Sequence, residues 1–466
     1  MDTKRVACLG AGFVGGPTMA VFASKCPEIQ FSVLDLDSSK IDSWNSSSLP
    51  IYEPNLFELI QLTRNQNLHF STNISEEILQ SDMIFISVPT PTKSHGLGAG
   101  KACDLSFFEQ AVRMIAQCLT GFKGTKIIVE KSTVPVRTAE MVKEILMNNC
   151  KELDFSVISN PEFLAEGTAV QDLLFPNRVL IGGESNLAIM SLVNLYQKWV
   201  PADKIVTTSL WSSELSKLCS NAMLAQRVSS INSISALCEK VGADIDEISK
   251  VLIRDDRIGS KFLQPSIGFG GSCFTKDVLC LVYICETLGL FEVAAYWQQV
   301  ITMNEFQRNR FCRIITRMVI NLKGKHFAIL GFAYKKNTSD TRESAAAYVC
   351  KSLLDEGAIL HVFDPRVNRN QMIAEMNLHG FLNGMEDEKK MVSFLDPYEA
   401  VKGCCGIVVL TEWDLFKGLD FSGMFNNMTK PAYVFDGRNI LDHKELKKIG
   451  FKAVAIGKSE FCMQVN

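Results

Sequence analysis

The sequence predicts an α/β protein with two doubly wound sheets, joined by a long central helix and a helical domain. Three observations predict this fold. The first 35 residues contain an apolar stretch, a glycine-rich turn directly after it and, further on, a second apolar stretch. A helical pattern then runs without proline or glycine from Ser213 to Lys240, and a second series of apolar stretches begins at His326. Strands that alternate with helices favour a mostly parallel sheet with helices on both faces.

The first segment opens with a strand, turn, helix and strand. Val6 to Leu9 is apolar, a glycine-rich turn follows at 10–15, and Phe31 to Leu34 precedes Asp35. This order is typical of the first βαβ unit of a dinucleotide-binding fold. Further strands are expected at 83–88, 126–129 and 157–158, with helices at 105–119 and 138–147. We assign residues 1–212 to a first, Rossmann-like domain.

The middle of the chain is predicted to be helical. Apolar residues recur at helical spacing between Ser213 and Lys240, which indicates one helix long enough to connect domains and to provide a dimer surface. A second α/β pattern starts at 326–331 and continues at 360–365, 407–410 and 434–437. We therefore expect a central helical domain at 213–322 and a second Rossmann-like domain at 323–466.

Composition narrows the class of protein. The net charge of -3 gives no basic excess for nucleic acid or for an anionic membrane, so neither is expected as a partner. The 15 cysteines include no C-x-x-C pair and only six histidines are present, so no metal site is expected. No signal peptide or membrane-spanning stretch is evident, and we expect a cytoplasmic protein with reduced thiols.

The turn Gly10-x-Gly12-x-x-Gly15 has the spacing of a dinucleotide-binding loop. Its glycines allow the backbone to approach a pyrophosphate at the N-terminus of the next helix. Asp35 follows the second strand, where its carboxylate can bind both ribose hydroxyls. The same charge would repel a 2′-phosphate, so the sequence favours NAD over NADP.

A second glycine-rich turn spans 268–271 and leads to Ser272 and Cys273. We expect Ser272 to cap the following helix and Cys273 to lie in its first turn. Exposed backbone N–H groups there lower the pKa of a thiol and make it nucleophilic. Lys276 and Asp277 would lie within reach of it.

Three other groups of polar residues are candidates, although each has a plain structural alternative. Lys217 and Asn221 share one face of the long helix and could hold an oxyanion, but an isolated lysine is usually solvated. Glu162 and Glu166 follow a strand, where open α/β sheets bind ligands. The segment 130–133 follows another strand, and either segment could simply begin a helix.

With these motifs in place, the sequence resembles the UDP-glucose/GDP-mannose dehydrogenase family from about Arg5 to Lys458. Two of the motifs, LPIYEP and SSELSKL, favour its UDP-glucose branch. The full set is GAGFVGGPT at Gly10, LPIYEP at Leu49, EKSTVPVR at Glu130, SNPEFLAEGTA at Ser159, SSELSKL at Ser212, GFGGSCFTKD at Gly268, KKNTSDTRES at Lys335 and FDGRN at Phe435.

The resemblance implies a four-electron oxidation of UDP-glucose to UDP-glucuronate with two NAD. Cys273 would form a thiohemiacetal with the aldehyde, and oxidation of that adduct would give a thioester that water hydrolyses. Lys217 and Asn221 would stabilise the oxyanion, Asp277 with Thr133 would handle a water and its proton, and Glu162 would assist hydrolysis. Whether Lys217, Asp277 or a bound water removes the first proton stays open.

The resemblance also carries over two sets of binding residues and an assembly. The residue matching Arg257 comes from a neighbouring subunit in the family, which implies a homo-oligomer, either a dimer or an assembly of dimers. The implied cofactor contacts are Gly10, Gly12, Phe13, Val14, Gly15, Asp35, Lys40, Thr90, Thr133, Glu166, Lys276 and Arg342. The implied substrate contacts are Glu162, Phe163, Leu164, Ala165, Glu166, Lys217, Asn221, Arg257, Phe269, Gly270, Tyr334, Lys335 and Arg438.

Two other functions are compatible with parts of the sequence. A two-electron dehydrogenase of the hydroxyacid or 6-phosphogluconate type would use Lys217 and leave Cys273 idle. A non-catalytic NAD-binding paralogue is favoured only by Pro89, which replaces the family's usual asparagine and removes a backbone donor.

Overall fold

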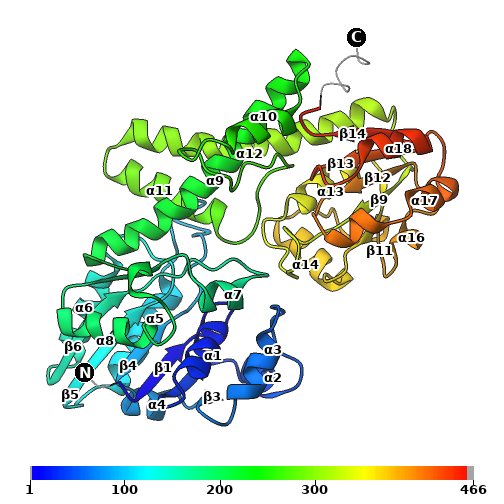
Figure 1. Ribbon diagram of the computed structural model, residues 1–466. Coiled ribbons are helices and arrows are strands. Elements are labelled where there is room, and N and C mark those ends of the chain that lie inside the picture. Colours follow the sequence, from blue (N-terminus) through cyan, green and yellow to red (C-terminus); the bar gives the residue numbers. More distant parts are fainter. Residues whose placement is uncertain (1–2, 459–466) are drawn as a thin grey trace. The chain divides into compact units, whose positions relative to one another are not determined.

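The computed structural model describes residues 3–458, and the chain divides into two compact units after Ser220. The division falls inside the long helix α9 (Leu210–Val241), which confirms the single helix predicted over 213–240. Each unit is described by itself (Figure 1). Between residues 3 and 458, no helix combines the length and the apolar character that crossing a bilayer requires.

The first unit is built on an eight-stranded sheet in the order β3-β2-β1-β4-β5-β6-β7-β8. Only β6 and β7 pair antiparallel, so the predicted doubly wound, mostly parallel sheet is confirmed. The strands are β1 (Arg5–Leu9), β2 (Gln30–Leu34), β3 (Leu68–Ser71), β4 (Met83–Ile86), β5 (Gly124–Glu130), β6 (Leu153–Ser159), β7 (Val179–Gly183) and β8 (Ile205–Thr208).

Helices cover both faces of this sheet, because β1 alternates its buried side chains between two apolar cores. Val6 and Cys8 pack into the core that contains α1, whereas Ala7 and Leu9 pack into the core that contains α5 and α6. The helices of this unit are α1 (Gly15–Lys25), α2 (Ser38–Asn45), α3 (Leu56–Thr63), α4 (Ile74–Gln80), α5 (Ser106–Cys118), α6 (Thr138–Asn149), α7 (Ala169–Leu174) and α8 (Asn186–Tyr196), with a 3₁₀ turn at Ala202–Lys204.

The second unit begins with helices and continues into a six-stranded parallel sheet in the order β11-β10-β9-β12-β13-β14. The helices that precede the sheet are α10 (Ile245–Leu252), α11 (Phe274–Thr287) and α12 (Phe291–Met318). The strands are β9 (His326–Leu330), β10 (Ile359–Phe363), β11 (Met391–Phe394), β12 (Gly406–Val409), β13 (Tyr433–Asp436) and β14 (Lys452–Ala455). This sheet confirms the second α/β pattern predicted from residue 326 onward.

One large apolar core joins this sheet to its helices, and it includes Phe311 and Ile315 of α12. The covering helices are α13 (Ala345–Asp355), α14 (Arg369–Leu378), α15 (Met385–Lys390), α16 (Pro397–Ala400), α17 (Phe421–Asn427) and α18 (His443–Ile449), with a 3₁₀ turn at Asp414–Gly418. The sheet of this unit therefore packs against α12.

Candidate active site

The first glycine turn has the shape of a cradle for a phosphate group. Gly10 has a φ of +106°, and a Cβ there would lie 2.1 Å from the Ser87 carbonyl oxygen. A Cβ at Gly15 would lie 2.0 Å from the Gly10 carbonyl oxygen, whereas a Cβ at Gly12 would meet nothing within 4 Å. Gly12 thus leaves open space beside the N-terminus of α1, which is the place where a pyrophosphate binds in this kind of turn.

Asp35 lies directly beside this turn, as its position after β2 predicts. Its Oδ2 accepts hydrogen bonds from the Ala11 amide at 3.0 Å and from Lys40 Nζ at 2.9 Å. The side chain of Asp35 is 16% exposed, so the carboxylate can still meet a ribose. Phe13 and Val14, which complete the turn, are both partly exposed. The geometry therefore fits the adenosine half of NAD.

Two further residues predicted to contact NAD are brought together from loops that are distant in sequence. The Thr90 hydroxyl donates to the Thr133 carbonyl oxygen at 2.7 Å, and it joins the loop after β4 to the loop after β5. Pro89, next to Thr90, is exposed at the surface of the first loop. Both loops follow the carboxyl ends of parallel strands, which is the ligand-binding edge of such sheets.

The same unit contains a buried ion pair between two predicted catalytic residues. Lys217 Nζ lies 3.0 Å from Glu162 Oε1, and the two side chains are 3% and 8% exposed. Glu162 Oε2 accepts a hydrogen bond from the Leu164 amide at 2.6 Å. Burial opposes ionisation of Glu162, but Lys217, this amide and the Lys131 ammonium outweigh it and lower the pKa of the carboxyl group. Glu162 is therefore an anion held by a buried cation.

The segment that carries Glu162 is a loop, not the start of a helix. Residues 160–168 are irregular and α7 begins at Ala169, so the alternative that this motif merely starts a helix is wrong for Glu162. Ala165 donates its amide to Asp172 Oδ2 at 3.0 Å, and Glu166 is partly exposed. The Phe163 ring faces the Arg178 guanidinium at 3.7 Å, beside a cavity of about 60 Å³.

Sequence reasoning missed the residue that holds this loop. Glu53 is 6% exposed, and its two carboxylate oxygens accept from the amides of Gly167 at 2.8 Å and Ala169 at 2.6 Å. Glu53 therefore caps α7 from a segment 116 residues away. The only signal for it was its place in the LPIYEP motif.

Two titratable groups at the end of β5 belong to the predicted candidate segment 130–133, but the sequence did not predict that both are buried. Lys131 Nζ donates to Asn160 Oδ1 at 3.0 Å and to the Tyr196 hydroxyl at 3.2 Å. Burial lowers the pKa of Lys131 to about 8, although Glu162 opposes this shift. The neighbouring Glu130 is fully buried, and burial together with the carboxyl group of Glu214 raises its pKa well above the usual value. Lys131 thus connects the end of β5 to Asn160, which follows β6, and to Tyr196 of α8.

In the second unit, Cys273 lies at the N-terminus of α11 but not inside its first turn. The helix begins at Phe274 and Cys273 is its N-cap residue, so the prediction that Ser272 caps the helix is wrong. The reason is Gly271, whose φ of +87° turns the chain so late that Ser272 precedes the cap position. The Ser272 hydroxyl lies 3.6 Å from Cys273 Sγ instead. Cys273 is nevertheless the one exposed thiol among the cysteines of residues 3–458.

A buried amide–carboxylate pair lies one turn beyond Cys273. Asp277 is 1% exposed, and its Oδ2 accepts from Asn221 Nδ2 at 2.6 Å. Lys276 Nζ lies 3.1 Å from the other oxygen of the same carboxylate. The main chain of α11 links Asp277 to Cys273, because the Asp277 amide donates to the Cys273 carbonyl oxygen at 2.9 Å. The Lys276 ammonium and the Asp277 carboxylate thus lie in the first turn of α11, directly after the N-cap residue Cys273.

Asn304 and Tyr334 shape the turn before Cys273. The Asn304 side chain accepts from the Phe269 amide at 2.8 Å and donates to the Phe269 carbonyl oxygen at 3.0 Å. A Cβ at Gly271 would lie 2.8 Å from the Tyr334 ring. The turn is clamped by α12 on one side and by the segment after β9 on the other.

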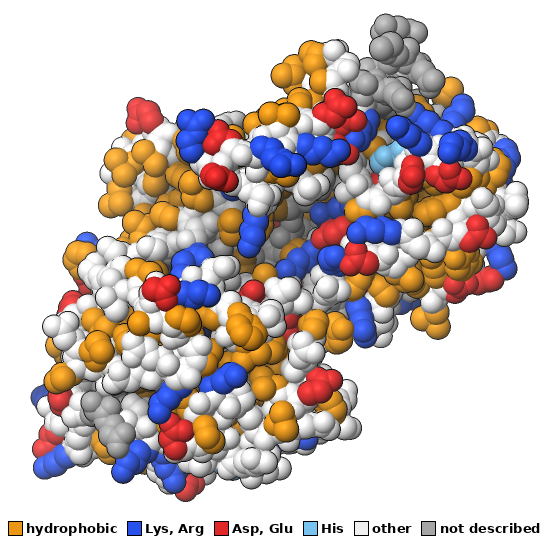
Figure 2. Space-filling view, viewed as in Figure 1, with side chains coloured by type: hydrophobic (Ala, Val, Ile, Leu, Met, Phe, Trp, Pro, Cys, Tyr) orange, Lys and Arg blue, Asp and Glu red, His pale blue; other side chains and the backbone are white. Residues whose placement is uncertain are grey.

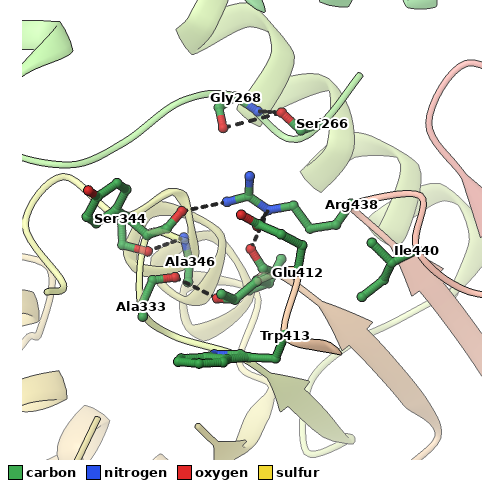
Figure 3. A network of polar contacts seen from close by, with 12 residues as sticks. Ser266, Gly268, Ala333, Ser344, Ala346, Glu412, Trp413, Arg438 and Ile440 are labelled. Atoms are coloured by element: carbon green, nitrogen blue, oxygen red, sulfur yellow. Dashed lines mark hydrogen bonds and ion pairs between the residues drawn. The ribbon is translucent and has the colours of Figure 1, made fainter. Parts of the chain in front are cut away.

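The cations among the predicted substrate contacts differ in their surroundings. Arg438 is 10% exposed and donates to the carbonyl oxygens of Leu410 at 2.7 Å and Tyr334 at 3.0 Å, and it also faces Glu412 (Figure 3). It therefore supports the segment that carries Tyr334 and Lys335. Lys335 Nζ lies 5.5 Å from the Tyr334 ring centre.

Arg342 and Arg257 each pair with an aspartate two residues earlier. Arg342 contacts Asp340 at 2.7 Å and its side chain is 46% exposed. Arg257 contacts Asp255 at 2.7 Å, and its side chain is 90% exposed.

Within residues 3–458, no three His, Cys, Asp or Glu side chains come together as a metal ion would require.

Family models match three consecutive parts of this chain. They are the NAD binding domain of the UDP-glucose/GDP-mannose dehydrogenase family at residues 4–200, its central domain at 211–306 and its UDP binding domain at 328–443. These ranges contain the first glycine turn, the Cys273 turn and the segment around Tyr334 respectively.

Curated proteins and solved structures agree with these matches. The chain is 53% identical to a UDP-glucose 6-dehydrogenase from Bos taurus, over 98% of this chain and 94% of the relative. It is 51% identical to UDP-glucose 6-dehydrogenase 2 from Arabidopsis thaliana, over 97% of each. A UDP-glucose dehydrogenase from Pyrobaculum islandicum superposes with a TM-score of 0.84 at 28% identity, over 97% of both chains.

Proposed function

This chain belongs to the UDP-glucose/GDP-mannose dehydrogenase family, and from this premise we propose that it oxidises UDP-glucose to UDP-glucuronate through a covalent adduct on Cys273. The protein is an NAD-dependent oxidoreductase. Its reaction removes four electrons from the C6 alcohol, which NAD accepts as two hydrides in successive steps. We place the reaction in the cytoplasm, where a catalytic thiol stays reduced.

The exposed thiol at the start of α11 is the observation that supports a four-electron reaction. The first oxidation turns the alcohol into an aldehyde. The carbon of an aldehyde is trigonal, and it can release a second hydride only after a nucleophile has added to it and made it tetrahedral. Addition of the Cys273 thiolate to the aldehyde gives a thiohemiacetal, whose oxidation gives a thioester. Water then attacks the thioester, releases the carboxylate and returns the thiol.

Two buried pairs, one in each unit, have roles in this scheme that their chemistry supports. Asn221 donates to Asp277, so the Asp277 carboxylate is fixed one turn from Cys273 and can take a proton from a thiol or a water. Lys217 can stabilise an oxyanion, and Glu162 can activate the water that hydrolyses the thioester. Thr133, held by Thr90, would orient that water.

The second sheet supplies groups for the UDP part of the substrate. Tyr334 offers a ring and Lys335 an ammonium from the segment after β9, and Arg438 fixes the backbone of that segment. A diphosphate needs cations, and we assign Lys335, Arg257 and Arg438 to that role.

We also propose a homo-oligomer, a dimer or an assembly of dimers. The support is an apolar surface of the second unit, where α11 and α12 meet; Figure 2 shows hydrophobic side chains gathered over this end of the two helices. Its exposed members are Leu288, Leu290, Phe291, Val293 and Tyr296, of which Leu288 is 68% and Phe291 66% exposed. Light scattering of the purified protein, with Phe291→Asp as the variant that shifts it toward monomer, tests this assembly.

The decisive experiment is the ratio of NADH formed to UDP-glucose consumed with excess NAD. We expect two NADH per sugar from the wild type. Cys273→Ser should form no acid while it still binds UDP-glucose, whereas Cys118→Ser, which changes a partly buried thiol of α5, should behave as wild type. One NADH per sugar would indicate a two-electron dehydrogenase, and none would indicate a non-catalytic nucleotide-binding protein. Near-normal acid formation by Cys273→Ser would contradict the covalent mechanism.

A further inference from the structure

We propose that Glu375 and His379, at the end of helix α14, form a positioning pair for the turn that carries Cys273. The pair acts through the Thr341 hydroxyl and the Glu343 amide and touches none of the groups assigned to chemistry above. The inference deepens the proposed function, since it concerns how the same thiol is held. It follows from contacts that lie entirely within the second unit.

The first step is the close contact between the Cys273 turn and residues 342–343. A Cβ at Gly270 would lie 2.4 Å from the Glu343 carbonyl oxygen, so only glycine allows the two main chains to approach this closely. The Gly271 amide donates to the Arg342 carbonyl oxygen at 2.9 Å. Any shift of the main chain at 342–343 must therefore move the turn before Cys273.

The second step is the conformation of Glu343, which needs support from outside the turn. Glu343 has a φ of +53°, a left-handed conformation that is unfavourable for a residue with a Cβ. Its amide donates to Glu375 Oε1 at 3.0 Å, and the Thr341 hydroxyl lies 3.4 Å from Glu375 Oε2. Glu375 is 5% exposed, and one buried carboxylate thus fixes the residues on either side of Arg342.

The third step is the charge balance around Glu375. His379 Nε2 lies 3.0 Å from Glu375 Oε1 and 3.8 Å from Glu343 Oε1, so one imidazole faces two carboxylates. The hydrogen bond to Glu375 raises the pKa of His379, although burial opposes this and Glu343 adds to it. When it is protonated, His379 offsets the repulsion between the two carboxylates.

The other groups that face His379 come from two further helices and the following loop. Tyr348 of α13 donates its hydroxyl to Glu343 Oε2 at 2.8 Å, and the Arg308 guanidinium of α12 lies 3.8 Å from the Tyr348 ring centre. Arg308 lowers the pKa of His379, but less than Glu375 and Glu343 raise it. Phe381 stacks on the imidazole with a centroid distance of 5.0 Å. The charges facing His379 are therefore predominantly negative.

The test measures how fast iodoacetamide alkylates Cys273 in the full-length protein without substrate. Positioning at the helix N-terminus favours the thiolate, so a loosened turn should slow alkylation. We expect Glu375→Ala to slow it at least threefold at pH 7. Asn377→Ala, an exposed change on the same helix, should leave the rate unchanged. Glu375→Gln keeps an acceptor for the Glu343 amide and should restore part of the rate.

The pH dependence separates positioning from a purely structural role. The alkylation rate of His379→Gln, divided by that of wild type, should be below one at pH 6, where the wild-type imidazole is protonated. The ratio should rise toward one as the pH increases and the wild-type imidazole loses its proton. A ratio that does not change with pH, or a wild-type rate in Glu375→Ala, would overturn the proposal. If Glu375→Ala fails to fold, Glu375→Gln and His379→Gln decide the question.

A stoichiometry measurement on the same proteins separates this inference from the proposed function. Suppose that the wild type forms two NADH per UDP-glucose and that the variants are alkylated at the wild-type rate. This result would support the proposed function and contradict the positioning pair. No NADH together with the expected alkylation ratios would support the positioning pair and contradict the proposed function. If the proposed function and the positioning pair are both supported, Glu375→Ala should lower kcat more than it raises the KM for UDP-glucose, because the pair orients the thiol and does not bind the sugar.

Discussion

Lys217 Nζ lies 3.0 Å from Glu162 Oε1, and both side chains are almost completely buried. Removal of one partner from a buried ion pair leaves the other charge without compensation, which costs about 3–5 kcal/mol. Lys217→Met should therefore lower the free energy of unfolding of the first unit by about 3 kcal/mol. Urea unfolding followed by tryptophan fluorescence measures this change.

The control for this prediction is an exposed ion pair in the same unit. Lys198 Nζ lies 3.0 Å from Glu28 Oε1 with side chains 51% and 53% exposed, so Lys198→Met should cost less than about 1 kcal/mol. The double variant Lys217→Met/Glu162→Gln should regain most of the lost stability, because it removes both charges. If the double variant is as unstable as Lys217→Met, packing and not charge is responsible.

The buried Glu130 predicts a loss of stability as the pH rises. Its pKa in the folded protein is raised, first by burial and then by Glu214, so the folded state retains a proton that the unfolded state releases near its ordinary pKa of about 4.3. Stability is therefore full below that value and falls as the pH rises toward the folded pKa. Glu130→Gln should remove this fall between pH 5 and pH 8 in urea unfolding.

Glu144→Gln provides the matched comparison for Glu130→Gln. Glu144 is exposed on α6, the helix whose first amides, at Arg137 and Ala139, donate to Glu214. This variant should unfold like the wild type at both pH values. An equal pH dependence in Glu130→Gln and in the wild type would show that Glu130 ionises normally in the fold.

Asp35 predicts the choice between NAD and NADP. Its carboxylate accepts from the Ala11 amide and from Lys40, beside the open face of Gly12. Loss of a charged hydrogen-bond acceptor for the ribose costs about 1.5–3 kcal/mol, so Asp35→Ala should weaken NAD binding by about 10-fold to 100-fold. Binding of NADP should improve relative to NAD, because the repulsion disappears and Lys40 remains.

Calorimetric titration with both dinucleotides checks this prediction. Asp42→Ala, an exposed change on the same α2 helix as Lys40, should leave both affinities unchanged. Unchanged NAD affinity in Asp35→Ala would mean that the ribose is bound elsewhere.

The sequence predicted the parts of the site that depend on local patterns. The glycine spacing at 10–15 and the position of Asp35 after β2 are encoded within one βαβ unit, and both are found as expected. The start of α11 was placed one residue wrongly relative to Cys273, because the left-handed Gly271 delays the helix. Such a turn conformation is not visible in residue types alone.

The parts that could not be predicted depend on partners far apart in the chain. Glu53 caps α7 across 116 residues, and Glu375 holds Glu343 across 32 residues. From the sequence alone, a glutamate is expected to be a solvated side chain. It has another role only where the fold buries it beside specific hydrogen-bond donors. The same holds for Glu130, whose partner Glu214 belongs to α9.

Lys131 predicts the opposite pH dependence to Glu130, in a separate range. Burial lowers its pKa to about 8, whereas an unfolded lysine has a pKa of about 10.4. Between these values the unfolded state binds more protons than the folded state, so the stability of the first unit should rise as the pH increases from 8 to 10. Lys131→Met, which keeps the length of the side chain, should abolish this rise. The Tyr196 hydroxyl still donates to Asn160 Oδ1 at 2.8 Å and limits the structural change. Lys151→Met, an exposed substitution in the same unit, should keep the wild-type slope in urea unfolding. An identical slope in Lys131→Met and the wild type would mean that Lys131 keeps its proton up to the ordinary lysine range, and that its bonds to Asn160 and Tyr196 compensate fully for burial.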